Sequence, residues 1–225
     1  MPSKEEDEPG TLRIRGVSKP KAVAGAIANK LRAGESFKVN GASPPARPRS
    51  FPPVAPPPKK TKLDPPPFFP SPPSRAAIGA DSVNQGIKAV IIARSYLKDD
   101  NIDLAIRPTV VDEVGPDVLS LAISKHATTA CEGADEEFSF KSAGATQASA
   151  LAGALAAKIR EGCKLLSVTS VGPAAALRSI KSIAMAASYV KEEGFSIYAV
   201  PVFVDLKMGE EDRTGVRLDV FAAKA

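Results

Sequence analysis

Two stretches of this chain repeat earlier ones, and this internal duplication limits the possible folds more than any other feature. A shift of 93 residues lays residues 83–112 on 176–205. Nearer the N-terminus, residues 22–34 match 150–162 at a shift of 128 residues. Two copies of the same segments in the same order indicate two modules of one kind, joined in tandem.

The first copy is the longer one, because the two shifts differ by 35 residues. Composition locates the extra residues, since 14 of the 21 prolines fall between Pro44 and Pro73. A proline-rich stretch cannot complete backbone hydrogen-bond ladders and buries little apolar surface. We therefore expect a disordered or polyproline II insert at about residues 40–75, projecting from the first module.

Several functions of this basic insert stay open. Pro53 and Pro56 frame a PxxP ligand for an aromatic groove, and the cluster of Lys59, Lys60 and Lys62 resembles a nuclear-targeting signal. The cations could also hold phosphates without sequence specificity. The alternative is a solvated linker, because short motifs in biased sequence often match by chance.

Apolar periodicity outside the insert predicts the order β-α-β-α-β-β in each copy. Ser18 is expected to cap the first helix, and Ser82 with Gln85 to form a capping box for the second, after a strand end at residues 76–79. A turn is expected at residues 205–213. Two helices on one face of a four-stranded sheet give an α+β two-layer sandwich. The predicted units are a charged tail (1–10), a first module (11–124), a polar linker (125–136) and a second module (137–225).

Charge is unevenly distributed along these units. Residues 1–10 carry one lysine against four acids, residues 11–75 carry thirteen Lys or Arg against two acids, and residues 76–225 carry sixteen against nineteen. The positive excess therefore lies in the first third of the chain. A concentrated basic region favours nucleic acid or acidic partners.

Other classes of protein are not supported by the sequence. No apolar run is long enough to span a bilayer and the N-terminus is acidic, so we expect a soluble, cytoplasmic protein, or a nuclear one if the insert lysines act as a signal. The two cysteines, Cys131 and Cys163, form no disulfide framework or metal cluster. His126 is the single histidine and falls in the linker. We expect no catalysis, no metal and no cofactor.

Three runs of sequence resemble one known family. They are residues 18–28 (SKPKAVAGAIA), residues 78–90 (IGADSVNQGIKAV) and, in the second copy, residues 208–214 (MGEEDRT). In this order they resemble the stage V sporulation protein S (SpoVS) family, a module of the Alba-like superfamily. The resemblance implies two tandem Alba-like sandwiches that form a pseudo-dimer, and a superfamily that binds nucleic acid.

The resemblance also implies where nucleic acid would be held. Alba-like proteins approach it with the loop after the first strand, which here carries Lys19 and Lys21, close to Arg13 and Arg15. They also use a basic hairpin, but here the expected hairpin tips are acidic and repel phosphate. The corresponding loop of the second copy has no cation.

Lys88 and Lys181 occupy equivalent positions in the two copies, and Arg178 lies close to the second. They either form a strip that contacts phosphates or serve as solubilising cations on polar helix faces. The sequence thus favours a non-enzymatic protein that binds DNA or RNA through phosphates. The alternative is a regulatory protein–protein interaction module that uses the insert and the acidic hairpins, without nucleic acid.

Overall fold

A computed structural model describes residues 11–14, 16–34, 37–41, 77–110, 119–126, 138–209 and 211–224. The proline-rich insert, both tails and the segment around residues 111–118 lie outside the described residues. The first copy contains β1 (Thr11–Ile14), α1 (Pro20–Arg32), β2 (Phe37–Gly41), α2 (Ala77–Leu97), β3 (Asp103–Val110) and β4 (Leu119–His126). The second contains β5 (Phe138–Ser142), α3 (Ala148–Arg160), β6 (Leu165–Ser170), α4 (Pro173–Lys191), β7 (Phe195–Met208) and β8 (Glu211–Lys224). The expected α+β class and the repeated β-α-β-α-β-β order are confirmed.

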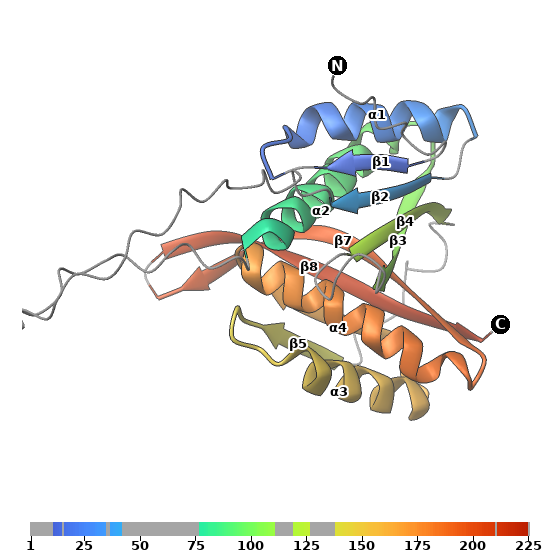
Figure 1. Cartoon of the computed structure of the whole chain (residues 1–225), viewed down its shortest axis with the longest axis vertical. Coiled ribbons are helices and arrows are strands. Elements are labelled where there is room, and N and C mark those ends of the chain that lie inside the picture. The colour runs from blue at the N-terminus through green and yellow to red at the C-terminus, as the bar shows by residue number, and fades with distance from the viewer. Residues whose placement is uncertain are drawn as a thin grey trace, which may run out of the picture.

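The strands of both copies join in one eight-stranded sheet of order β1-β2-β4-β3-β7-β8-β6-β5. This order reads the same from either edge, and the copies meet where β3 and β7 pair antiparallel at Ile106 and Ala199. The helices follow the same plan, because α1 packs on α2, α2 on α4 and α4 on α3. The arrangement of helices and strands is shown in Figure 1.

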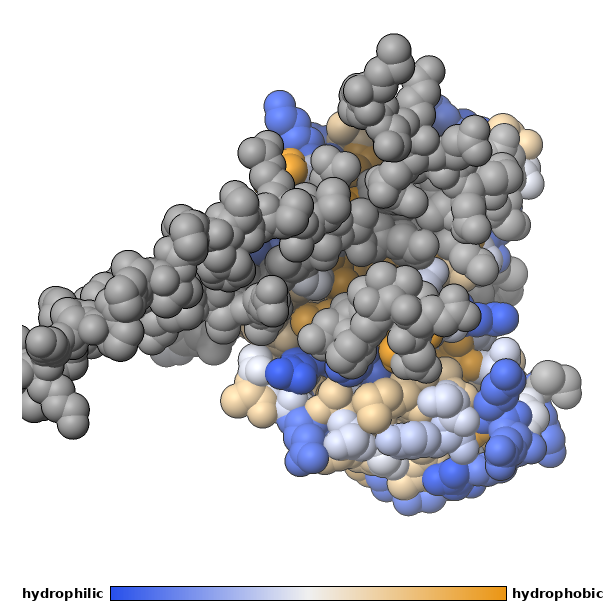
Figure 2. Space-filling view, in the orientation of Figure 1, coloured by the Kyte–Doolittle hydropathy of each residue, from blue (hydrophilic) through white to orange (hydrophobic). Residues whose placement is uncertain are grey.

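One hydrophobic core runs through both copies. It includes Ile87 and Val90 of α2 together with Ile180 and Ile183 of α4, all fully or almost fully buried. The inner helices also contact the inner strand of the opposite copy, α4 on β3 and α2 on β7. Figure 2 shows weakly apolar and weakly polar residues over the second copy's helices, with strongly hydrophilic side chains toward the edges. The apolar residues thus lie mainly between the layers, as burial of apolar surface requires.

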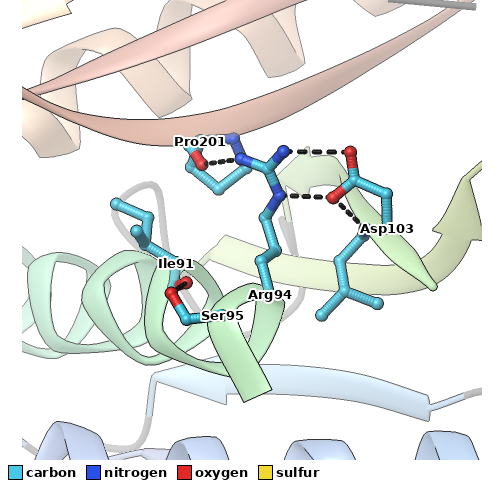
Figure 3. Close-up of polar contacts among 6 residues, drawn as sticks. Ile91, Arg94, Ser95, Asp103 and Pro201 are labelled. Atoms are coloured by element: carbon cyan, nitrogen blue, oxygen red, sulfur yellow. Dashed lines mark hydrogen bonds and ion pairs between the residues drawn. The ribbon is translucent and has the colours of Figure 1, made fainter. Parts of the chain in front are cut away.

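Arg94 ties the two copies together at the junction (Figure 3). Its guanidinium donates to both carboxylate oxygens of Asp103, at 2.5 and 2.9 Å, and its Nη1 donates to the backbone carbonyl of Pro201 in the second copy, at 2.6 Å. The side chains of Arg94 and Asp103 are 22% and 13% exposed, so the bidentate ion pair is shielded from water. Positions 187 and 196, which correspond to them in the second copy, are Ala187 and Ser196. This contact is therefore made only once.

Helix starts differ from the sequence prediction. The N-cap of α1 is Lys19 rather than Ser18, and the side chain of Lys19 makes no capping hydrogen bond. The helix α2 already begins at Ala77, so residues 77–79 are helical rather than a strand end, and Ser82 lies inside the helix instead of capping it. Serine favours a cap only where the chain enters the helix; the longer α2 moves that point upstream.

Strands β7 and β8 are longer than predicted and replace the expected turn at residues 205–213. The two strands pair without a break, from Phe195 opposite Lys224 to Met208 opposite Glu211. Gly209, in the turn between them, has φ +70°. Beyond Val216, where β6 stops pairing, five residue pairs continue as a two-stranded arm of about 16 Å. We call residues 204–215 the β7–β8 arm. Strand β4 likewise reaches His126, which the sequence placed in the linker.

Candidate nucleic-acid interface

All four helices begin on the side of the sheet from which the β7–β8 arm projects (Figure 1). Strand β1 runs parallel to β2 and β5 parallel to β6, so α1 and α3, which connect these pairs, each run opposite to the strands they join. Helix N-termini carry unpaired N–H groups and a partial positive charge. The N-cap residues Lys19, Gln147 and Gly172 make no side-chain capping hydrogen bond at α1, α3 and α4. This side of the molecule therefore favours anions.

Lys19 and Lys21 stand at the start of α1 on this side, and both are exposed. Their loop lies against the start of α2, because a Cβ on Gly16 would meet Cβ of Asp81 at 3.0 Å. The second copy repeats the contact, with Gly144 against Ala174 at 3.3 Å. The tight fit holds the loop beside the second helix in each copy.

A cleft of about 540 Å³ opens between α2, the start of α4 and the base of the β7–β8 arm. Its lining includes Asn84 and Lys88 from α2, Gly172 and Pro173 at the start of α4, and Phe203 from β7. The volume falls within the range of roughly 300–1,000 Å³ usual for small-molecule sites. Gly172 has φ +85° and serves as N-cap, a conformation that favours glycine.

Lys88 is the principal cation of this cleft. Among the described residues it makes no ion pair, and it lies half-buried beside the uncapped start of α4. Arg213 also lines the cleft, but its guanidinium pairs with Glu211 at 2.7 Å, which offsets its charge. A phosphate held here would meet one lysine beside the positive end of α4.

Asn84 is unusual because it is a polar residue at a core position. It is 8% exposed and takes part in no hydrogen bond among the described residues. The equivalent residue of the second copy is Leu177, which is also 8% exposed. The amide atoms are not enclosed on all sides, because Asn84 lines the open cleft. The first copy therefore keeps an amide where an apolar residue fits the fold.

A second hollow, of about 480 Å³, lies next to the cleft and shares Ser170 and Val171 with it. Lys141, at the end of β5, and Lys207, on the β7–β8 arm, both line it. The two cations come from the elements that the superfamily resemblance implied, the first strand with its loop and the hairpin.

The family model of stage V sporulation protein S (SpoVS) matches residues 74–124 and 139–223. These two segments make up more than half of the chain, and each falls in one copy of the duplication. The chain belongs to the SpoVS family. The match starts after the insert, but β1, α1 and β2 occupy the same places in the first copy as β5, α3 and β6 in the second.

The structure of this SpoVS protein brings some of the predicted site residues together and leaves others apart. Lys19, Lys21 and Lys88 lie on the side where the helices begin. Arg178 and Lys181 are half-buried in α4 and do not line the cleft of Lys88. The side chains of Arg13 and Arg15 lie outside the described residues, so their role stays a prediction.

Other features of this SpoVS protein were not singled out from the sequence. Lys207 was missed because the hairpin was assigned as an acidic turn. Phe203 and Lys141 fell in predicted strands, and nothing in the local pattern showed that they line a cleft. Asn84 was noted only as a neighbour of Lys88, although aligning the copies pairs it with Leu177 and reveals the exchange. Among the described residues no group of three His, Cys, Asp or Glu side chains could hold a metal ion. None of the described helices is long and apolar enough to cross a membrane.

Proposed function

We propose that this SpoVS protein binds DNA or RNA without catalysis, mainly through phosphates, on the side where its helices begin. The observation that carries the proposal is the gathering of Lys19, Lys21 and Lys88 with uncapped helix starts on that side. Lysine charges and helix N–H groups both attract phosphate and carry no information about base sequence. The expected binding is therefore sequence-independent.

The mechanism is charge neutralisation with release of counterions. Affinity should fall linearly in a plot of log K against log salt, with a slope of about −0.7 to −0.9 per phosphate contacted. The carboxylates of the β7–β8 arm limit the number of contacts, since Asp205, Glu211 and Asp212 are exposed there. Binding should accordingly involve few phosphates and be weak at physiological salt.

Replacing Lys19 and Lys21 by alanine tests this proposal. Each lost phosphate contact should flatten the salt slope by about 0.7–0.9. Fluorescence anisotropy of a labelled duplex DNA and a labelled single-stranded RNA over a salt series measures the slope.

Lys98→Ala/Lys191→Ala is the matched control. It removes the same charge from exposed positions just after α2 and at the end of α4. The control should keep the wild-type slope. Equal salt slopes for the wild-type protein and both double variants would show that Lys19 and Lys21 do not contact phosphates.

The alternative, a regulatory protein-interaction module, is favoured by one observation: the exposed carboxylates of the β7–β8 arm disfavour polyanions. Deleting residues 43–75 separates the two. Loss of a protein partner with nucleic-acid binding intact would support a recruiting role for the insert. Absence of nucleic-acid binding at low salt, by the full chain, would favour the alternative as the main function.

A further inference from the structure

We infer that the cleft between α2 and the β7–β8 arm binds one unpaired nucleotide, with its phosphate at Lys88 and its base against Phe203. This inference rests on the proposed function and adds to it a site and a class of ligand. A single nucleotide within a single strand and a free nucleotide share this chemistry. The experiment below tells these two sources apart.

The buried amide of Asn84 is the first observation behind the inference. It lines the cleft at 8% exposure, and no described residue satisfies its hydrogen-bonding groups. Its amide atoms are not fully enclosed, so they face the cleft, where a ligand can reach them. A base edge offers donors and acceptors with which such an amide can pair. Leu177 at the equivalent position shows that the fold itself does not require the amide.

Phe203 supplies the second observation. Its ring is 42% exposed and lines the cleft. It pairs with Val216, whose side chain belongs to the core beneath the helices, so Phe203 is on the helix-facing side of β7. An exposed aromatic ring beside a lysine is the combination on which single-stranded bases stack. A base in a duplex is covered by its neighbours, so the cleft selects an unpaired base.

The duplication limits this site to one per chain. The positions equivalent to Asn84 and Phe203 are Leu177 and Val110, whereas Lys88 is matched by Lys181. The symmetry-related site, with Leu177 and Lys181 from α4 and Val110 from β3, therefore keeps the cation but has neither the amide nor the ring. We expect one nucleotide to bind to each chain.

Binding of two short single strands of equal length, one with bases and one fully abasic, tests the inference. Both carry the same phosphates, so the proposed function alone predicts equal affinity. Stacking on Phe203 should make the base-bearing strand bind roughly 5- to 150-fold more tightly. Phe203→Ala and Asn84→Leu should reduce that preference and leave binding of the abasic strand unchanged. Tyr189→Ala is the control, because it removes an aromatic residue of the same exposure, 42%, near the end of α4. This variant should keep the wild-type preference for the base-bearing strand.

The outcomes separate this inference from the proposed function. Equal, salt-sensitive binding of both strands by the wild-type protein would overturn the nucleotide site and leave phosphate binding standing. If neither strand binds at low salt, the proposed function fails. A titration with adenosine monophosphate then tests whether the cleft binds a free nucleotide. Binding of adenosine monophosphate that Phe203→Ala abolishes would identify a free-nucleotide site; no binding of it would overturn the inference as well.

Discussion

At the scale of single residues, the duplication acts as an internal comparison. Two copies of one fold show which residues the fold tolerates at each position. Where the two copies carry different kinds of residue at one position, a requirement other than the fold can explain the difference. Asn84 against Leu177 is the clearest case, because both side chains are equally buried. Lys88 and Lys181 are the opposite case, in which a shared residue is compatible with simple solvation.

Asn84→Leu should therefore stabilise the protein. Replacing a largely buried amide by an apolar side chain should add about 1 kcal/mol to the free energy of unfolding, which raises Tm by about 2–4 °C for a chain of this size. Leu177→Asn is the reciprocal control and should lower Tm. A scan of thermal unfolding measures both. A lower Tm for Asn84→Leu would show that the amide holds the native structure together.

At the scale of elements, one ion pair recurs in both copies and joins the two helices of each. Arg32 pairs with Asp100 at 2.7 Å and donates to the carbonyl of Tyr96, as Arg160 pairs with Glu193 at 2.6 Å and donates to the carbonyl of Tyr189. The hydrogen bond from Arg160 lowers the pKa of Glu193 from its ordinary value. A lowered pKa in the folded state stabilises the protein above the ordinary pKa of glutamate, and that contribution is lost as the pH falls through the lowered value.

Glu193→Gln should consequently have a slightly lower Tm than the wild type at neutral pH, with the difference shrinking as the pH falls below the ordinary range for glutamate. The effect should be small because the pair is exposed to solvent. Glu192→Gln removes the same charge from the neighbouring position and is the control. A Tm difference that stays constant down to acidic pH would contradict this role of the pair.

Element boundaries could be predicted where a pattern was local. The spacing of apolar residues over 148–160 predicted α3 with both of its ends correct. The β7–β8 arm could not be predicted in this way, because its charges look like a turn. Cross-strand pairs such as Lys207 with Asp212 let these residues extend in a solvated ribbon instead. The start of α2 was missed because the serine at position 82 matched a cap motif.

At the scale of the whole molecule, sequence comparison gave the duplication, the fold class and the family. It did not give the joining of both copies into one sheet, since strand order depends on contacts between distant residues. Arg94 shows the difficulty: its partner Pro201 lies 107 residues away. The site was predictable only in part for the same reason, because the cleft combines α2 of one copy with α4 and the β7–β8 arm of the other.

We propose that the folded part of the chain, rather than the proline-rich insert, holds nucleic acid. The most direct measurement is a salt series of binding to duplex DNA and single-stranded RNA, by the full chain and by a variant without residues 43–75. We predict salt-sensitive binding that survives the deletion, with the contribution of Lys19, Lys21 and Lys88 retained. Binding that disappears with the insert would contradict the account and leave the insert as a generic cationic tether.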